Sequence, residues 1–291
     1  MSVGMMQTTV DANTEANHYD GRDAEDRIAQ VYMGRLGSQR TIDKARARID
    51  WIVESVTGQT VLDVGCSEGI VSLLLARRGR TAVGVDINPA AIDAAHALIA
   101  SEPDVVREKL TFLVKDIQSD VSEFGRKFDS IVIGEVLEHL TSHRALLTAC
   151  KDILAADGKI IITTPLGYFP HPDHHTTFGI QNFCDQVRPL FEPEHLSVSD
   201  GYIRFIGKQT SDILPNWAAY PDAELLRISE EALIGLQRKA VDESRELRTK
   251  LNTLREKMAR VTEDNKRLKE LVRRSTLARI YFKVKELLLR K

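Results

Sequence analysis

Several features that define whole classes of protein are scarce or missing in this sequence of 291 residues. Only three cysteines are present, Cys66, Cys150 and Cys184, and none forms a C-x-x-C pair, so we expect neither a disulfide framework nor a zinc–thiolate site. No apolar run reaches the roughly 18 residues of a transmembrane helix. The polar, acidic N-terminus lacks the basic and then apolar order of a signal peptide. These absences predict a cytoplasmic protein.

Neither sign of charge dominates the chain, but the charges are unevenly distributed. The formal net charge is −2, from 40 Lys and Arg against 42 Asp and Glu. Residues 222–291 hold 19 of the basic and 12 of the acidic side chains, a net charge of +7, which leaves −9 for residues 1–221. An acidic body joined to a basic tail predicts different partners for the two parts.

Short β-branched runs alternate with stretches of helical periodicity from about residue 60 onward. The runs are TVLDVG, TAVGVD, LTFLVKD, FDSIVIG and GKIIITTP. This alternation predicts βαβ units and an α/β, Rossmann-like doubly wound sheet that is mostly parallel. Two later extended stretches, LSVSD and GYIRFIGKQ, predict an antiparallel last strand. We therefore expect a flexible leader over 1–20 and a folded domain over 21–215.

The region after residue 222 has a different pattern. It has no Gly or Pro after Gly235 and is rich in charge. Its apolar residues are spaced by alternating steps of four and three, which predicts a coiled coil over 222–274 rather than a single charged helix lying along the body. Asn265 occupies an a position, a device that favours a parallel dimer, so we expect a parallel homodimer. The seam consists of Leu247, Leu251, Leu254, Met258, Val261, Asn265, Leu268 and Val272.

Residues 275–291 form a separate basic amphipathic segment. An apolar stripe at helical spacing includes Leu277, Ile280, Val284 and Leu288, and basic side chains fill the opposite face. Such a helix suits the anionic inner face of a membrane, as a peripheral contact. It equally suits the groove of a protein partner, and the sequence does not separate the two.

Three acidic residues follow three successive predicted strands: Asp63, Asp86 and Asp116. Parallel strands end at one edge of the sheet, so these carboxylates are expected together at a nucleotide-binding edge, with Asp86 placed to bind a ribose diol. Gly65 and Gly69 allow the backbone between the first strand and the first helix to approach a ligand closely. The turn matches neither the dinucleotide fingerprint G-x-G-x-x-G nor a P-loop.

Over about residues 40–208 the chain resembles the class I S-adenosylmethionine-dependent methyltransferases. The matching motifs are DVGCSEG, GVDIN, KDI, FDSIVIGEVLEHL and LAADGKIIITTP, with Ser67 where many members carry glycine. The resemblance implies S-adenosylmethionine as cofactor. It places the ribose hydroxyls on Asp86 and the adenine against Ile87, with Asp116 and Ile117 flanking the adenine amino group. The implied cofactor-binding residues are Asp63, Gly65, Cys66, Gly69, Asp86, Ile87, Asp116, Ile117 and Glu135.

The segment GEVLEHL offers groups for chemistry. If it opens a helical turn, Glu135, Glu138 and His139 share one face, and two carboxylates with an imidazole can hold a divalent ion. The combination of E-x-x-E-H with a later Asp-His resembles the small-RNA 2′-O-methyltransferases, and the first part also resembles the ubiquinone-biosynthesis O-methyltransferases. That resemblance implies Mg²⁺ or Mn²⁺ on Glu135, Glu138, His139 and His174, with His175 as an alternative fourth ligand.

Metal-free methyltransferases also carry this motif, so a metal-free reading stays open. The candidate general bases are His139 if it is not a ligand, and otherwise His143 or His175. A cation that holds two adjacent oxygens predicts a vicinal diol or a catechol as acceptor.

A sugar or glycan hydroxyl is the favoured acceptor. A quinone or phenol is the main alternative. A 3′-terminal ribose of RNA is disfavoured, because the body is acidic. A coiled-coil scaffold whose domain binds cofactor without catalysis is the non-enzyme alternative.

Overall fold

The computed structural model describes residues 27–118, 121–210 and 223–289, so the leader predicted over 1–20 lies outside the described residues. Seven strands form one sheet in the order β3-β2-β1-β4-β5-β7-β6. The first five strands in chain order are parallel, β7 is antiparallel to β5, and β6 is antiparallel to β7. The strands are β1 Thr60–Val64, β2 Thr81–Asp86, β3 Leu110–Val114, β4 Phe128–Gly134, β5 Leu154–Pro165, β6 Phe191–Ser199 and β7 Tyr202–Gln209. The predicted Rossmann-like sheet with an antiparallel end is confirmed.

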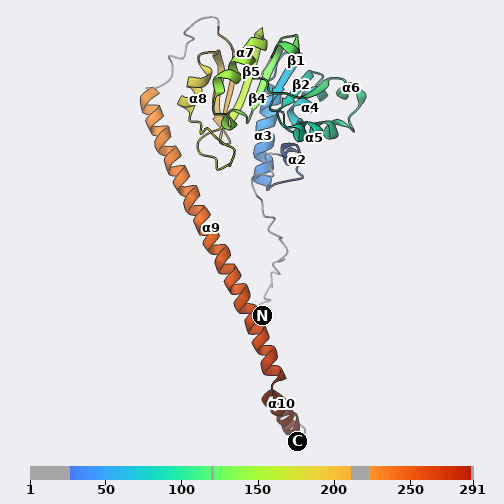
Figure 1. Cartoon of the computed structure of the whole chain (residues 1–291), viewed down its shortest axis with the longest axis vertical. Coiled ribbons are helices and arrows are strands. Elements are labelled where there is room, and N and C mark those ends of the chain that lie inside the picture. Colours follow the sequence, from blue (N-terminus) through green and yellow to red (C-terminus); the bar gives the residue numbers. More distant parts are fainter. Residues whose placement is uncertain (1–26, 119–120, 211–222, 290–291) are drawn as a thin grey trace, which may run out of the picture. The chain divides into compact units, whose positions relative to one another are not determined.

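Helices cover both faces of this sheet (Figure 1). They are α2 Ile28–Tyr32, α3 Gln39–Ser55, α4 Ile70–Arg77, α5 Pro89–Ile99, α6 Asp104–Arg107, α7 His143–Ile153 and α8 Ile180–Val187, with 3-10 turns η1 Ser122–Phe124 and η2 Leu137–His139. Their ends follow ordinary capping rules. The Ser38 side chain accepts a hydrogen bond from the amide of Thr41 at the start of α3. The Asn88 side chain accepts one from the amide of Ala90 at the start of α5, whose first residue is Pro89.

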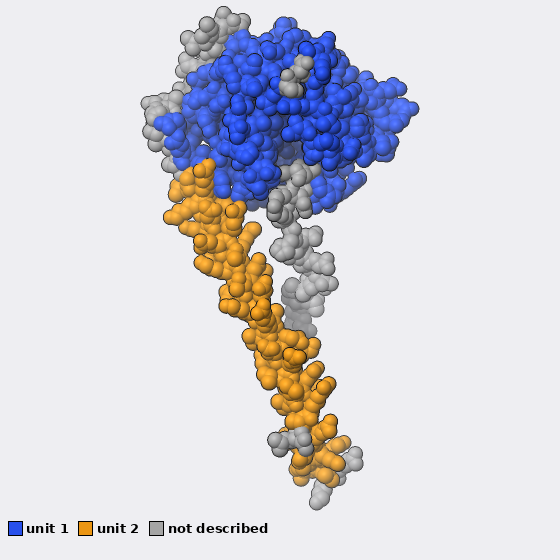
Figure 2. Space-filling view, viewed as in Figure 1, with its two compact units in different colours: residues 1–234 blue, residues 235–291 orange. Residues whose placement is uncertain are grey.

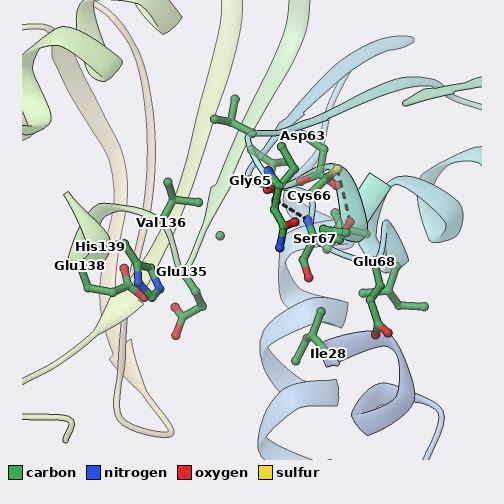
Figure 3. A pocket seen from close by; sticks show the side chains of 18 of the residues that line it. Ile28, Asp63, Gly65, Cys66, Ser67, Glu68, Glu135, Val136, Glu138 and His139 are labelled. Atoms are coloured by element: carbon green, nitrogen blue, oxygen red, sulfur yellow. Dashed lines mark hydrogen bonds between the residues drawn. The ribbon is translucent and has the colours of Figure 1, made fainter. Parts of the chain in front are cut away.

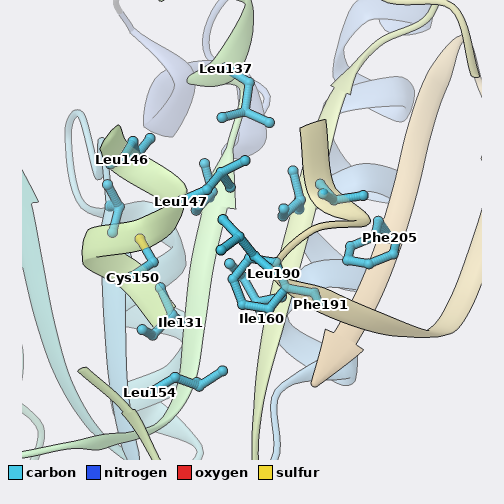
Figure 4. Packing of buried hydrophobic residues seen from close by; sticks show 14 of the residues in the cluster. Ile131, Leu137, Leu146, Leu147, Cys150, Leu154, Ile160, Leu190, Phe191 and Phe205 are labelled. Carbon is cyan, nitrogen blue, oxygen red and sulfur yellow. The ribbon is translucent and has the colours of Figure 1, made fainter. Parts of the chain in front are cut away.

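The central strands are buried on both sides, which is why their sequences are runs of apolar residues rather than alternating patterns. One core cluster packs α7 and α8 against one face of the sheet, with Leu147, Cys150, Phe191 and Phe205 among its buried members (Figure 4). A second cluster packs α3 and α4 against the other face. The strand order turns back between β1 and β4, because β2 and β3 lie on one side of β1 while β4 and β5 lie on the other. In such sheets ligands bind at this switch point, beyond the carboxyl ends of the strands.

The C-terminal region is helical: α9 spans Ala223–Arg274 and α10 spans Thr276–Leu289. The chain divides into two compact units, residues 1–234 and 235–291, so the first turns of α9 belong to the first unit (Figure 2). Within that unit, the Glu230 carboxylate accepts hydrogen bonds from the amides of Ile180 (2.8 Å) and Gln181 (3.0 Å) at the start of α8. A carboxylate there satisfies amides that have no partner inside the helix.

The predicted long helix is thus present, whereas its pairing as a coiled coil stays a prediction. The described side chains of the seam, Leu251 and Met258 among them, are exposed in the single chain. No helix within the described ranges is both long and apolar enough to cross a membrane.

Candidate active site

A cavity of about 1090 Å³ lies at the switch point of the sheet. Figure 3 shows the turn from Gly65 to Glu68 on one side of it, and Glu135, Val136, Glu138 and His139 on the other. Residues of α2 and α3 complete the lining, among them Ile28 and Arg48. Pockets that bind drug-sized ligands measure roughly 300–1,000 Å³, so the cavity has room for a nucleoside cofactor together with an acceptor.

The turn after β1 is shaped by two left-handed residues, Gly65 (φ 67°) and Ser67 (φ 47°). A Cβ on Gly65 would overlap Cγ2 of Val136, so only glycine fits between β1 and β4. Ser67, the departure from the family pattern, adopts a conformation that glycine takes more easily. Its amide donates to Oδ2 of Asp86 (2.9 Å), which ties the end of β1 to the end of β2.

The acidic residues at the three strand ends all line the cavity: Asp63, Asp86 and Asp116. Asp86 also accepts from the amide of Asn88 through Oδ1 (2.9 Å), and Oδ1 of Asp116 accepts from the amide of Gln118 (2.9 Å). Both carboxylates are therefore held in place by backbone amides.

The apolar partners implied for the cofactor also lie at the cavity. Ile87 is 74% exposed and Ile117 is buried, and both line it, as does Cys66. Gly69 does not line the cavity. It is the left-handed N-cap of α4 (φ 76°), and a Cβ there would lie 2.7 Å from the ring of Phe112. Its position is thus explained by packing rather than by contact with a ligand.

Asp63 is buried, and its Oδ2 accepts from the hydroxyl of Ser72 (2.7 Å). Burial raises the pKa of Asp63 to about 7, although the Ser72 hydrogen bonds oppose this effect. The carboxyl group therefore changes protonation near neutral pH.

Glu135 has a left-handed backbone (φ 61°) directly after β4, a conformation that is uncommon for non-glycine residues and is enriched at functional sites. Its Oε1 lies 3.8 Å from the guanidinium of the buried Arg48, in α3. Burial raises the pKa of Glu135, and the charge of Arg48 opposes that rise. The regular helical turn expected from residue 135 is wrong, because a left-handed residue precedes a 3-10 turn that holds only Leu137–His139.

Glu138 is buried in this 3-10 turn and accepts from the hydroxyl of Thr164 through Oε2 (2.9 Å). Burial raises the pKa of its carboxyl group well above the usual range, and the neighbouring Glu135 raises it further. The carbonyl oxygen of Glu138 accepts from the amides of His175 (2.8 Å) and Thr176 (3.0 Å). The loop between β5 and α8 is thereby fixed against the 3-10 turn.

Three histidines gather where this loop meets the turn: His139, His171 and His174. One potential ligand atom of each lies within 4.8 Å of the others, and among the described residues this is the one group of three or more His, Cys, Asp or Glu that could hold a metal ion. Glu135 and Glu138 do not belong to it. The four-residue set Glu135, Glu138, His139 and His174 is thus divided, with its carboxylates held by Arg48 and Thr164 and its imidazoles joined by His171.

His143 and His175 do not line the cavity, although both were candidate bases. His143 is buried in the first turn of α7 and packs against the ring of Phe178 at 5.2 Å between centroids. His175 contributes its amide to the loop attachment. His139 lines the cavity and is half-buried, and burial lowers the pKa of its imidazole, so it is neutral at pH 7.

The sequence reasoning missed the contribution of α3. Arg40, Lys44 and Arg48 line the cavity and are spaced four residues apart, so they share one face of the helix. That spacing was visible in the sequence, but nothing there showed that this face covers the site. Glu68 was also missed; its Oε2 accepts from the buried amide of Ala29 (2.9 Å) and joins the cofactor turn to α2.

Comparison with known proteins agrees with this arrangement. Residues 37–198, more than half of the chain, match the family described as methyltransferase domain. The ubiquinone biosynthesis O-methyltransferase of Actinobacillus pleuropneumoniae serotype 5b (strain L20) is 30% identical over 120 residues, which are 40% of this chain and 51% of that protein. The corresponding protein of Pseudomonas entomophila (strain L48) is 33% identical over 121 residues, 40% of this chain and 50% of that protein. The match thus spans about half the length of these relatives.

Among solved structures, magnesium protoporphyrin IX methyltransferase from Synechocystis PCC 6803 superposes with a TM-score of 0.51. It is 16% identical, and the match covers 66% of this chain and 96% of that one. A protein from Pyrococcus horikoshii OT3 gives a TM-score of 0.50 at 19% identity, over 60% of this chain and 93% of that one. These likenesses concern the fold. The chain therefore belongs to the methyltransferase-domain family and has the Rossmann-like fold of the class I S-adenosylmethionine-dependent methyltransferases.

Proposed function

We propose that the protein transfers a methyl group from S-adenosylmethionine to a hydroxyl of a sugar or glycan that carries a negatively charged group. The observation that carries this proposal is the polarity of the cavity wall facing the cofactor residues. Arg40, Lys44 and Arg48 line it from α3, and Glu135 and His139 line it from the end of β4. Such a wall suits a hydrophilic acceptor better than a prenylated ring, since an apolar group placed against charged side chains removes water from them at a cost in free energy.

In this proposal the cofactor lies along the ends of β1, β2 and β3. Asp86 binds the ribose hydroxyls, and Ile87 and Ile117 contact the adenine. Asp116 lies near the adenine amino group, and Gly65 leaves space for the methionine end. The sulfonium is already a good leaving group, so the protein mainly aligns the acceptor oxygen behind the methyl carbon.

The reaction forms an O–CH₃ bond as the S–CH₃ bond breaks, and the cofactor leaves as S-adenosylhomocysteine. The hydroxyl proton must be removed, and in the metal-free protein we propose that the neutral imidazole of His139 takes this proton. His143 packs outside the cavity and so is not placed to act as the base. His175 also lies outside the lining and is not placed to do so.

The basic row on α3 suggests the anionic group. Arg48 is buried beside Glu135, while Lys44 is half-buried and Arg40 is exposed. The two outer cations are thus placed to bind a phosphate or carboxylate that enters from solvent.

A transfer assay with a labelled methyl donor tests the proposal on matched acceptors: sugar phosphates or uronic acids, the corresponding neutral sugars, and catechols. We expect transfer to the charged sugars. Lys44→Ala should raise the KM for the acceptor with cofactor affinity unchanged, whereas Asp86→Asn should weaken S-adenosylhomocysteine binding itself. Transfer to catechols alone would contradict the proposal. Cofactor binding without transfer to any acceptor would support the scaffold alternative.

A phenolic or quinone acceptor is the second candidate. It is supported by the relatives named ubiquinone biosynthesis O-methyltransferase, with identities near 30% over 40% of this chain.

For the C-terminal region we propose a parallel homodimer through α9. The seam residues, such as Leu254 and Leu268, are exposed in the single chain and would be buried by a second copy. In a parallel pair, g and e positions five residues apart meet. Two of these interchain pairs are then attractive, Glu243 with Arg248 and Asp264 with Lys269. One pair, Lys250 with Arg255, is repulsive.

We further propose that α10 contacts an anionic membrane surface. Ile280, Val284 and Leu287 are exposed on it, and the segment 273–291 holds seven basic residues and one acidic residue. Flotation with vesicles that contain phosphatidylserine should recover the protein, and vesicles of phosphatidylcholine alone should not. Ile280→Asp should abolish the recovery. No binding to either vesicle would contradict the membrane proposal and favour a protein groove.

A further inference from the structure

We infer that His139, His171 and His174 form a three-imidazole metal site at the acceptor end of the cavity, for Zn²⁺ or a similar divalent ion that prefers nitrogen ligands. The inference rests on the proposed function only for the role of the metal. The site differs from the predicted carboxylate-rich set in both its ligands and its metal.

The geometry of the cluster suits a small ion. The ring centroids of His139 and His174 are 4.8 Å apart, those of His171 and His174 are 4.9 Å apart, and those of His139 and His171 are 5.9 Å apart. Zn²⁺ binds imidazole nitrogen at about 2.0–2.1 Å. Candidate ligand atoms within 4.8 Å of one another therefore reach one ion after modest side-chain rotations.

A hydrogen bond fixes the orientation of one ligand, His139, and a second, longer one places His171 at the same backbone segment. His139 donates from Nδ1 to the carbonyl of Asp173 (3.2 Å), which leaves the Nε2 lone pair for a metal, the arrangement that orients most metal-bound histidines. Nδ1 of His171 accepts from the amide of Asp173 at 3.3 Å, a long hydrogen bond whose lone pair a metal can take over. One backbone segment at Asp173 thus contacts two of the three rings.

The frame around the cluster is preformed. The loop that carries His171 and His174 is attached to the turn of His139 by the amides of His175 and Thr176 on the carbonyl of Glu138, and by the hydroxyl of Thr176 on the carbonyl of Leu140 (2.9 Å). Such a frame lowers the cost of ordering the ligands when the ion binds.

Three histidines leave a fourth tetrahedral position open, as in catalytic zinc sites. His139 and His171 line the cavity, so the open position can bind the acceptor oxygen. A bound hydroxyl would lose its proton to bulk water more readily, because the ion stabilises the alkoxide. His139 would then serve as a ligand rather than as the proton acceptor.

The test uses the full chain, stripped with a chelator and titrated with Zn²⁺, Co²⁺ or Mg²⁺. We expect one Zn²⁺ per chain, a visible absorption band with Co²⁺ typical of nitrogen ligation, and no binding of Mg²⁺. His139→Ala, His171→Ala and His174→Ala should each weaken Zn²⁺ binding by at least about 100-fold, since even residues behind metal ligands cost 10–100-fold when removed. His175→Ala, next in the loop and outside the cluster, is the matched control and should bind Zn²⁺ normally.

Two outcomes would overturn the inference. If His171→Ala binds Zn²⁺ as well as the wild type, His171 is not a ligand. If Glu138→Gln loses as much Zn²⁺ affinity as the histidine variants, the carboxylate-rich set is favoured instead. Titration of S-adenosylhomocysteine into each variant shows that the domain is folded. Zn²⁺ binding without transfer to any hydroxyl would contradict the proposed function and leave the metal site standing, whereas transfer by stripped protein that binds no Zn²⁺ would do the reverse.

Discussion

The guanidinium of Arg48 lies 3.8 Å from the carboxylate of Glu135, and the two side chains come from α3 and from the residue after β4. The helix that covers the cavity is thereby coupled to the wall that we assign to the acceptor. The Arg48 guanidinium also lies over the ring of Tyr202, 5.3 Å from its centroid, so the same side chain contacts β7 as well.

Arg48→Met should destabilise the protein because the half-buried Glu135 loses its nearest cation. Glu135→Gln in the same background should restore part of that loss, since a neutral amide needs no counter-charge. The expected coupling is about 1–3 kcal/mol in a double-mutant cycle measured by urea unfolding. Strictly additive effects would show that the pair does not interact.

Gly65→Ala should abolish cofactor binding, because the new Cβ overlaps Val136 and the left-handed backbone disfavours alanine. Gly79→Ala is a matched control: Gly79 is also left-handed (φ 88°), but a Cβ there meets nothing within 4 Å. We expect the control to lose only about 1 kcal/mol of stability and to keep its cofactor affinity. Val136→Ala should partly rescue Gly65→Ala in calorimetric titration with S-adenosylhomocysteine. Equal effects of both glycine substitutions would refute the steric argument.

Asp63→Asn should stabilise the protein at alkaline pH. The pKa of Asp63 is about 7 in the folded protein and 3.8 in the unfolded chain, so the unfolded chain releases the proton first. Stability is therefore lost as pH rises from about 4 through 7, and asparagine avoids that loss. Between pH 5 and pH 8 the advantage of the variant should grow by about 2–3 kcal/mol in urea unfolding.

Asp129 is a control whose contribution to stability changes with pH in the direction opposite to that of Asp63. Its pKa is lowered, chiefly by hydrogen bonds from the backbone amides of Thr60 and Gln59. Its contribution is present above the unfolded pKa and is lost as pH falls, so Asp129→Asn should destabilise most at neutral and alkaline pH. A pH-independent effect of Asp63→Asn would mean that its carboxyl group does not titrate near 7.

Asn265→Leu tests the proposed coiled coil. A buried asparagine at an a position costs stability but specifies a parallel pair. The variant should therefore melt at a higher temperature in the α9 transition and form mixed oligomers in light scattering after size exclusion. Leu251→Asn should instead weaken the dimer. A monomeric wild-type chain at micromolar concentration would contradict the pairing.

The positions of the strands along the chain were predictable from the sequence, because each buried strand is a short run of β-branched residues bounded by a helix-forming segment. The acids at strand ends were predictable for the same reason: Asp86 is the last residue of β2 and Asp116 lies two residues after β3, and these strands end at one edge of the sheet. Local pattern and tertiary position agree in this part of the chain.

The acceptor side was less predictable because tertiary contacts decide it. Glu135 takes a left-handed conformation between β4 and a 3-10 turn, where spacing alone suggested a regular helix. His171 joins the histidine cluster only because backbone hydrogen bonds fold its loop onto Glu138. Arg48 reaches Glu135 across 87 residues of sequence, and no local signal encodes that pairing.

Ile87 has a thermodynamic consequence for cofactor recognition. It is 74% exposed at the rim of the cavity, so in the free protein this apolar side chain is in contact with solvent. If adenine covers Ile87 as proposed, that surface leaves water on binding and the heat-capacity change is negative. The binding enthalpy then becomes more favourable as temperature rises, and Ile87→Ser should flatten this slope.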